Sequence, residues 1–340
     1  MSIAGGYYRA IESAHAVGCD CVQVFTKNNN QWKAKSILPD EAQQFSNALT
    51  RLGIRDPLSH TSYLINLASP DAGLLRQSID AMVVELQRAA QLGVPNVVLH
   101  PGSFTSSSEA QGLQAVARSL DEVFRQTSDL PTACLLENTA GQGTNLGWRF
   151  EHLAEIIAEC KYPDRLGVCI DTCHTFAAGY SLAPEPEYVK TLHALDRMVG
   201  LSRVKAFHLN DSKMPFGSRR DRHEHIGRGA MTLEPFRLLL NDSRFAKVPM
   251  YLETDKGTEG GEELDAINLR TLRFLVGAAA GVALASLAKS SEPGRRPARG
   301  KRLRTGVQAK PKLRRGGASS RSRAAKSPRK SKGPPKLGRR

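Results

Sequence analysis

Six acidic or imidazole side chains recur through the middle of the 340-residue sequence, and each closes a short run of the type that forms a β-strand. They are His60, His100, Glu137, Asp171, His208 and Glu253. Between 34 and 45 residues separate successive members, which is the length of one strand plus one helix. Three more residues of the same types, His174, Asp221 and His223, follow in the loops after these runs. Imidazole nitrogens and carboxylate oxygens are donors that zinc accepts, so the pattern predicts a site for several metal ions.

The strands and helices that must position these residues are visible in the same stretch of sequence. Strand-like runs end near Phe25, His60, His100, Glu137, Asp171, His208 and Glu253. Helical patterns accompany them at Tyr7 to Val17, Leu75 to Ala90, Phe150 to Cys160, Pro186 to Val199, Leu233 to Leu240 and Glu262 to Leu275. This alternation predicts an α/β fold with a parallel sheet, a TIM (β/α)8 barrel. Such a barrel carries its active site at the C-terminal ends of its strands, so the six residues would lie in one ring.

The strand count is one short of a complete barrel. Seven strand-like runs are present, whereas a closed barrel of this class has eight. The sequence opens directly on the helical pattern at Tyr7, so an eighth strand would have to precede Met1. We therefore expect a barrel that lacks its first strand, either because the chain begins late relative to a complete barrel or because the sheet closes imperfectly.

The formal net charge of +15 is concentrated in the C-terminal part of the chain. Residues 289 to 340 hold 20 of the 48 Lys and Arg residues and one of the 33 acidic residues, a net charge of +19. Residues 1 to 288 keep 28 basic and 32 acidic residues, a net charge of −4. The basic segment has no aromatic residue and is rich in Pro, Gly and Ser, so it cannot bury enough apolar surface to fold. We expect a barrel domain at 1–288 and a disordered tail at 289–340, which either binds the phosphates of nucleic acids non-specifically or is only a solubilising extension.

The sequence also favours an intracellular protein without a membrane anchor. Its first residues lack the basic and apolar regions of a secretory signal, so the six cysteines are expected to be reduced. We interpret Cys19, Cys21, Cys169 and Cys173 as small buried side chains, with thiolate metal ligands as the alternative. The apolar run from Phe274 to Ala288 is shorter than the roughly 18 residues of a membrane span and fits the end of a barrel helix. The expected location is the cytoplasm, or the nucleus in a eukaryote, in association with nucleic acid.

The segments around the nine candidate ligands resemble those of a known family, endonuclease IV. These are the zinc-dependent apurinic/apyrimidinic endonucleases of base-excision repair (AP endonuclease family 2). The matching segments are LSHTSYLINL at 58–67, VLHPGS at 98–103, LLENTAGQG at 135–143, CIDTCHTFAAG at 169–179, FHLND at 207–211, DRH at 221–223 and LET at 252–254. The resemblance extends from about Ser2 to Leu275, nearly the whole of the barrel part.

The resemblance implies a metal centre with three Zn²⁺ ions per chain. One ion would be held by His60, His100 and Glu137, a second by Glu137, Asp171, His208 and Glu253, and the third by His174, Asp221 and His223. Glu137 would bridge two ions, which makes it the side chain on which catalysis depends most. The implied reaction is hydrolysis of the phosphodiester on the 5′ side of an abasic site, leaving a 3′-hydroxyl and a 5′-deoxyribose phosphate. The implied partner is double-stranded DNA with abasic sites, bound by a monomer.

The resemblance also suggests which residues contact DNA. In the family a Tyr-Leu pair after the first ligand wedges into the duplex, and here the pair would be Tyr63 and Leu64, for which ordinary loop packing is the alternative. The loop from Lys27 to Trp32 would be a second recognition loop, with Asn30 where the best-known members carry Arg. Asn keeps hydrogen-bonding capacity but lacks the charge and reach of a guanidinium. The family's first strand, with a Gly-x-His-x-Ser type segment, has no counterpart here.

Two other functions fit parts of the sequence. A metal-dependent TIM-barrel sugar isomerase or epimerase would use a smaller set of Glu, Asp and His ligands, and would have no use for a +19 tail. A non-catalytic DNA-binding protein with a degenerate barrel would act through the tail alone, but it would not need all nine ligand-type residues. Nicking of an abasic-site duplex, measured together with bound metal, distinguishes the three.

Overall fold

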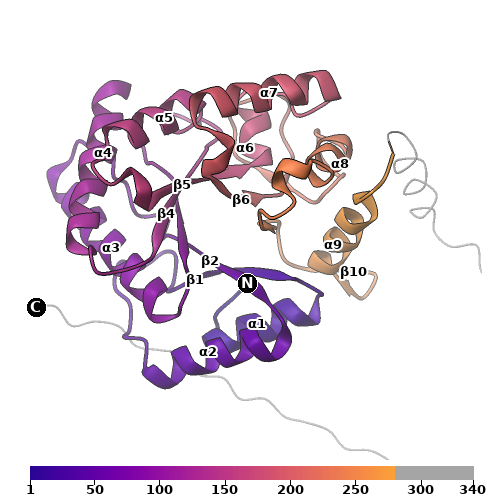
Figure 1. The fold of residues 1–340 in the computed structure, drawn as a ribbon, viewed down its shortest axis with the longest axis horizontal. Coiled ribbons are helices and arrows are strands. Elements are labelled where there is room, and N and C mark those ends of the chain that lie inside the picture. Colours follow the sequence, from indigo (N-terminus) through magenta and orange to yellow (C-terminus); the bar gives the residue numbers. More distant parts are fainter. Residues whose placement is uncertain (280–340) are drawn as a thin grey trace, which may run out of the picture. The chain divides into compact units, whose positions relative to one another are not determined.

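The computed structural model describes residues 1–279, which form a parallel sheet surrounded by helices (Figure 1). Seven strands are hydrogen-bonded in the order β1-β2-β3-β4-β5-β6-β9, and every neighbouring pair is parallel. Their bounds are Cys21–Phe25, Arg55–His60, Asn96–Leu99, Ala133–Glu137, Leu166–Asp171, Val204–His208 and Met250–Tyr251. Two short hairpins add β7 (Asp211–Ser212) with β8 (His223–Glu224) and β10 (Thr258–Glu259) with β11 (Glu262–Glu263).

Helices connect successive strands and cover the outside of the sheet. They are α1 Tyr7–Ala16, α2 Pro39–Leu52, α3 Ala72–Gln91, α4 Glu109–Gln126, α5 Phe150–Glu159, α6 Thr172–Ala177, α7 Glu185–Met198, α8 Glu234–Leu240 and α9 Leu264–Leu275. In Figure 1 the colours pass around the sheet, from indigo at α1 and α2 through magenta at α4 to orange at α8. Neighbours in the chain pack on one another, as α3 does on α4, α4 on α5, and α7 on α8. This is the architecture of a TIM barrel, as the sequence predicts.

Each strand contributes one residue to an apolar cluster on the inward side of the sheet. Cys21, Leu58, Val98, Leu135, Cys169, Ala206 and Tyr251 form a small apolar cluster that is separate from the larger core between sheet and helices. Because side chains alternate along a strand, the residue two positions further on projects to the same side. Those residues are Gln23, His60, His100, Glu137, Asp171, His208 and Glu253. These seven residues, which come from separate stretches of sequence, therefore form one polar ring that lies next to the apolar cluster on the inward side of the sheet.

The predicted strands and helices are confirmed with small shifts at their ends. His100 lies one residue beyond β3 and Glu253 two residues beyond β9. The predicted helix at Glu262 to Leu275 is wrong in its first turn, because Glu262 and Glu263 pair with β10 and the helix α9 begins at Leu264. The loop between β6 and α8 also contains the hairpin β7–β8, which places His223 beside Ser212.

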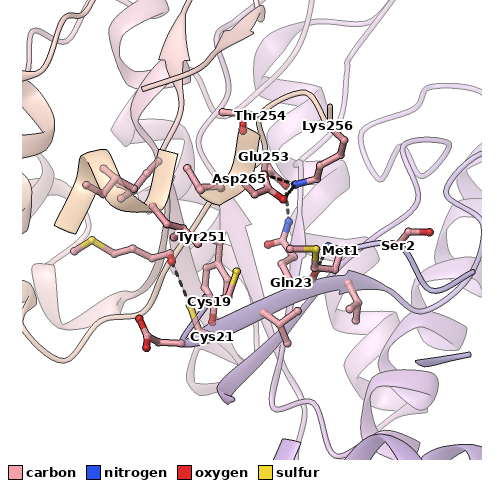
Figure 2. A pocket seen from close by; sticks show the side chains of 18 of the residues that line it. Met1, Ser2, Cys19, Cys21, Gln23, Tyr251, Glu253, Thr254, Lys256 and Asp265 are labelled. Carbon is pink, nitrogen blue, oxygen red and sulfur yellow. Dashed lines mark hydrogen bonds and ion pairs between the residues drawn. The ribbon is translucent and has the colours of Figure 1, made fainter. Parts of the chain in front are cut away.

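The two ends of the seven-stranded sheet, β1 and β9, form no strand pair with each other within the described residues, as expected for a barrel that lacks one strand. A cavity of about 350 Å³ lies between β1 and β9, lined by both strands, by Met1 and by residues of α9. Figure 2 shows Cys21 and Gln23 of β1 on one side of it, and Tyr251 and Glu253 on the other. Across it, the Cys21 thiol donates to the Met250 carbonyl over 3.2 Å. Side chains, rather than a strand pair, join the two edges.

The predicted tail at 289–340 lies outside the described residues, as does most of the apolar run from Phe274 to Ala288. The boundary between the two predicted parts therefore stays a prediction. Among residues 1–279, no helix combines the length and the apolar content that crossing a bilayer requires.

Candidate metal centre

All nine residues predicted as metal ligands lie together at the C-terminal ends of the strands. Six come from the polar ring, His174 comes from α6, Asp221 comes from the loop that leads into β8, and His223 is the first residue of β8. Their nitrogen and oxygen atoms form overlapping groups in which the atoms lie within 4.8 Å of one another. Two of the groups are the ones expected from the sequence, namely His60–His100–Glu137 and Glu137–Asp171–His208–Glu253.

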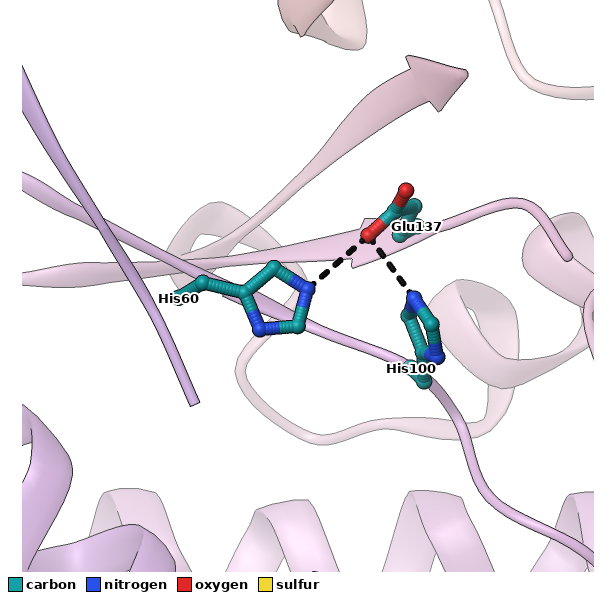
Figure 3. A group of neighbouring side chains, drawn as sticks. All are labelled: His60, His100 and Glu137. Carbon is teal, nitrogen blue, oxygen red and sulfur yellow. Dashed lines mark hydrogen bonds and ion pairs between the residues drawn. The ribbon is translucent and has the colours of Figure 1, made fainter. Parts of the chain in front are cut away.

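Glu137 is the residue that these two groups share. Its Oε2 lies 3.2 Å from His60 Nε2 and 3.0 Å from His100 Nε2, as Figure 3 shows. Its Oε1 lies 2.9 Å from His208 Nδ1, which is also 3.1 Å from Glu253 Oε2. Glu137 is fully buried at the end of β4. One of its carboxylate oxygens faces His60 and His100, and the other faces His208. A carboxylate placed in this way is suited to bridge two cations.

The third expected group is brought together by two short elements. Asp171 caps the N-terminus of α6, where its Oδ1 accepts from the backbone N–H of His174 over 2.7 Å. This turns the His174 ring so that its Nε2 lies 3.2 Å from Asp221 Oδ2. The second oxygen of Asp221 lies 3.2 Å from His223 Nε2. Asp171 also contributes to this region, because its Oδ2 lies 3.7 Å from His223 Nε2.

Two of the histidine rings, those of His60 and His174, are oriented as metal-binding histidines are. His60 Nδ1 donates to the Thr61 carbonyl and His174 Nδ1 to the Asn138 carbonyl, each over 2.8 Å. In both rings this leaves Nε2 directed at the carboxylates of the centre. A metal-binding imidazole characteristically uses one nitrogen on a carbonyl or carboxylate oxygen and keeps the other for the ion. The donor set and its orientation therefore fit cations with nitrogen and oxygen ligands.

Burial and opposite charge act against each other on the pKa values in this centre. Burial would raise the pKa of Glu137, but the His208 imidazole and its neighbours outweigh burial and hold that pKa well below the ordinary carboxyl value. Burial likewise opposes ionisation of Glu253, and His208 brings its pKa down to about 2. Burial would lower the pKa of His223, but the Asp171 carboxylate leads the charges that raise it to about 9. Glu137 and Glu253 are therefore ionised at neutral pH, and the centre attracts positive charge.

Three polar residues that are not among the predicted site residues hold the ligands in place. Gln23 accepts from His208 Nε2 over 2.7 Å and donates to Glu253 Oε1 over 2.5 Å. Asn210 donates to Asp171 Oδ2 and accepts from the backbone N–H of Glu253. Asn138 accepts from the backbone N–H of Asp171. Gln23 carries a signal in the sequence, since it is the polar inward residue of an otherwise apolar strand.

The predicted DNA-contact residues lie on two loops beside the centre. Tyr63 is 57% exposed, and its ring centroid lies 5.5 Å from that of His60 and 6.3 Å from that of His100. Leu64, the next residue, is half-buried. Asn30 is exposed on the loop after β1, where its backbone N–H donates to Asn28 Oδ1 over 2.9 Å. A pocket of about 240 Å³ beside Tyr63 is also lined by His60 and His100.

All six cysteines are unpaired, and the interpretation of four of them as small buried side chains is confirmed for Cys169 and Cys173. Cys19 and Cys21 are half-buried at the β1 end of the sheet. Burial raises the pKa of Cys169 and of Cys173 to about 12. Although Cys173 lies near Asp221 and His223, its thiol keeps its proton at neutral pH. An ion bound beside Asp221 and His223 would displace that proton, so Cys173 stays the alternative ligand to the nitrogen and oxygen donors.

Comparison with known proteins gives one family model and many relatives. A model described as "Xylose isomerase-like TIM barrel" matches residues 11–274. The "Probable endonuclease 4" of Geobacter sp. (strain M21) is 47% identical over 276 residues, which cover 81% of this chain and 97% of that protein. The crystal structure of endonuclease IV from Thermus thermophilus superposes with a TM-score of 0.72 at 37% identity, over 82% of this chain and 98% of that one.

Sugar-converting enzymes share the fold at lower identity. The crystal structure of a D-tagatose 3-epimerase-like protein superposes with a TM-score of 0.62 at 16% identity, over 84% of this chain and 98% of that one. At this identity the likeness shows the barrel architecture alone.

Proposed function

Because this chain belongs to the endonuclease IV family, within the xylose isomerase-like TIM barrels, we propose that it is a DNA-repair endonuclease acting at abasic sites. It hydrolyses the phosphodiester on the 5′ side of the abasic nucleotide and leaves a 3′-hydroxyl and a 5′-deoxyribose phosphate. The observation that carries the proposal is the set of nine ligand-type residues, which seven separate stretches of sequence bring within contact of one another. A barrel with a decayed function would have no reason to keep all nine.

The centre holds three zinc ions in this proposal. His60, His100 and Glu137 hold one, while Asp171, His208 and Glu253 hold a second together with Glu137. The third is held by His174, Asp221 and His223, with Asp171 close enough to His223 to join this group. Bound zinc supplies an activated water at neutral pH and neutralises charge on the phosphate oxygens.

The chain's own side chains supply orientation and charge rather than a covalent nucleophile. The buried thiols of Cys169 and Cys173 keep their protons because burial raises each pKa to about 12, so neither is an anionic nucleophile at neutral pH. Glu137 remains ionised because the surrounding imidazoles depress its pKa. Gln23, Asn138 and Asn210 hold the ligands rigidly, which fixes the position of the phosphate relative to the attacking water.

Lesion recognition is assigned to the two loops beside the centre. An abasic nucleotide has lost its stacking, so it leaves the duplex at a lower free-energy cost than an intact nucleotide does. Tyr63 and Leu64 fill the space that opens in the duplex, and Asn30 contacts the duplex from the loop after β1. The chain acts as a monomer in association with DNA, in the cytoplasm of a bacterium or the nucleus of a eukaryote.

The test combines a nicking assay with metal analysis on the same preparation. A duplex with one abasic-site analogue should be cut once on its 5′ side, and a DNA polymerase should extend the new end without phosphatase treatment. Protein purified without added metal should contain about three equivalents of zinc. An intact duplex and the Glu137→Ala variant are the controls. Activity on a ketose sugar without nicking, or a single bound ion, would contradict the proposal and support the epimerase alternative.

A further inference from the structure

The two loops that carry the proposed DNA contacts rest on a layer of buried polar side chains. Thr26 and Lys27 begin the first loop, Ser62 lies at the start of the second, and Glu85 and Arg88 project from α3 beneath both. Each of the five is at most 6% exposed. Burying charged groups is unfavourable unless they are paired and hydrogen-bonded. The partners of these buried side chains therefore show which parts of the two loops the layer holds in place.

Glu85 contacts both loops at once. Its Oε2 accepts from Thr26 Oγ1 over 2.7 Å, and its Oε1 lies 3.2 Å from Lys27 Nζ. The same Oε1 accepts from the backbone N–H of Ser62 over 3.2 Å. One carboxylate therefore fixes the residues that follow β1 and the residues that follow β2. Tyr63 is the next residue after the one whose backbone Glu85 holds.

A second link joins the loops directly. Ser62 Oγ donates to the Asn29 carbonyl over 2.6 Å and accepts from the backbone N–H of Leu64 over 3.3 Å. Asn29 precedes Asn30, so the backbones of the two proposed contact sites are connected through a single hydroxyl. Lys27 Nζ closes its own loop by donating to the Gln31 carbonyl over 2.8 Å.

Arg88, three residues after Glu85 on α3, holds the base of the first loop. Its guanidinium donates to the Thr26 carbonyl and to the Lys35 carbonyl, each over 2.6 Å. These two carbonyls lie on either side of residues 27–32, so Arg88 fixes the distance between the two ends of this segment. Glu85 instead fixes the position of the first loop relative to the second. The metal ligands take no part in these contacts.

We propose that Glu85 is a positioning residue that couples the two loops, so that Asn30 and the Tyr63–Leu64 pair meet the DNA as one preformed unit. The proposal rests on the proposed function, since it assigns lesion recognition to these loops. A buried Lys–Glu pair is a weak source of stability compared with apolar residues of similar volume. The pair instead holds both loops in place before DNA binds, so that the loops lose less conformational entropy on binding.

Glu85→Gln tests the coupling with the least change of shape. The amide keeps one acceptor but loses the charge opposite Lys27, so the hold of α3 on both loops should weaken while the direct Ser62–Asn29 link remains. We expect affinity for an abasic duplex to fall about tenfold, with affinity for an intact duplex changed less than about twofold. Zinc content should be unchanged, and single-turnover cleavage at saturating protein should change less than about threefold.

Two further variants separate positioning from general destabilisation. Ser62→Ala removes the direct link and should also lower lesion preference, and combining it with Glu85→Gln should give less than the product of the two effects. Asp242→Asn is the matched control, because this nearly buried carboxylate accepts from Tyr188 and Arg244 far from both loops. It should lower the melting temperature while leaving the ratio of abasic to intact affinity unchanged.

Hydrogen exchange provides a readout that does not depend on activity. In Glu85→Gln, amides in both loops, 27–32 and 61–65, should exchange faster together, while those around the metal ligands keep their protection. Unchanged lesion preference in Glu85→Gln, or faster exchange in one loop only, would overturn the coupling. If the wild-type protein binds zinc yet fails to nick an abasic duplex, the proposed function itself is wrong, and exchange in the two loops still decides whether Glu85 couples them.

Discussion

Gln23 illustrates how one side chain can complete a metal centre without being a ligand. It lies on β1 in the same inward position that the ligands occupy on the other strands, and it contacts His208 and Glu253 at once. By accepting from His208 Nε2, Gln23 selects the tautomer that carries its proton on Nε2. The unprotonated Nδ1 then faces Glu137 and Glu253 and is free for a metal ion.

Replacing Gln23 by Ala should therefore weaken metal binding without removing a ligand. We expect the zinc dissociation constant to rise about 10- to 100-fold, the range typical of residues that orient metal-binding histidines. Competition with a chromophoric chelator measures it, and Gln43→Ala, a change on the exposed face of α2, serves as the control. Equal zinc affinities for Gln23→Ala and wild type would show that His208 needs no such support.

Replacing Glu137 by Ala should be the most damaging single change in the centre. It removes the carboxylate shared by two groups and leaves the buried rings of His60 and His208 without their partner. We expect kcat/KM to fall at least about 1,000-fold, equivalent to about 4 kcal/mol of activation free energy. The control is Glu155→Ala on the exposed face of α5. Near-normal turnover of Glu137→Ala would exclude the bridging role.

At the scale of elements, the seven-stranded sheet ends in two edges that face each other across a cavity. The strands β1 and β9 each lack a strand partner on that side within the described residues, and unpaired edges of this kind are a weakness in a sheet. The cavity of about 350 Å³ between them is lined mainly by side chains of the two strands and of α9. Gln23 and Glu253 project into this region from opposite sides (Figure 2).

Adding a strand-forming segment upstream of Met1 should stabilise the barrel and its metal centre together. A strand paired with both β1 and β9 would satisfy their free backbone groups and replace the side-chain contacts of Cys21 and Gln23 that now join the two edges. We expect the melting temperature to rise by at least about 2 °C, with slower loss of zinc to a chelator. An upstream segment of equal length and Gly-Ser composition is the control. Equal melting temperatures for the two proteins would show that the side chains lining the gap already satisfy the edges.

At the scale of the whole chain, charge is divided unequally between the two predicted parts. Residues 1–288 carry −4 and residues 289–340 carry +19. DNA is a polyanion, so the first part gains no long-range attraction outside its metal centre, whereas the second part attracts any duplex. Without aromatic residues it has no means of stacking on bases, which leaves phosphate contacts.

Deleting residues 289–340 should weaken binding to intact and abasic duplexes by similar factors. The dependence of log affinity on log salt concentration should become flatter, because fewer counterions are released from the DNA. Cleavage under single-turnover conditions at saturating protein should barely change. Replacing the 20 basic residues of the segment by Gln provides a matched control of equal length. Loss of cleavage at saturation, or an unchanged salt slope, would assign the segment a different role.

The spacing of ligand-type residues and the alternation of strands and helices are local patterns, and the sequence predicts both correctly. His60, His100, Glu137, Asp171 and His208 each end or directly follow a strand because β-forming runs precede them, and parallel strands align their C-terminal ends. The number of strands, seven rather than eight, can also be counted from the sequence, and the seven-stranded sheet of the described residues confirms it.

Other features depend on contacts between residues far apart in the chain, which no local pattern encodes. The hairpin β7–β8 that places His223 beside His174 has strands of two residues each, too short to show a period. Glu85 lies among the apolar positions of α3, and its role follows only from the packing of that helix under two loops that begin 59 and 23 residues away. Composition and periodicity determine which elements form, but tertiary packing decides which polar side chains come into contact, because the distances between them are set only when strands and helices pack around the core.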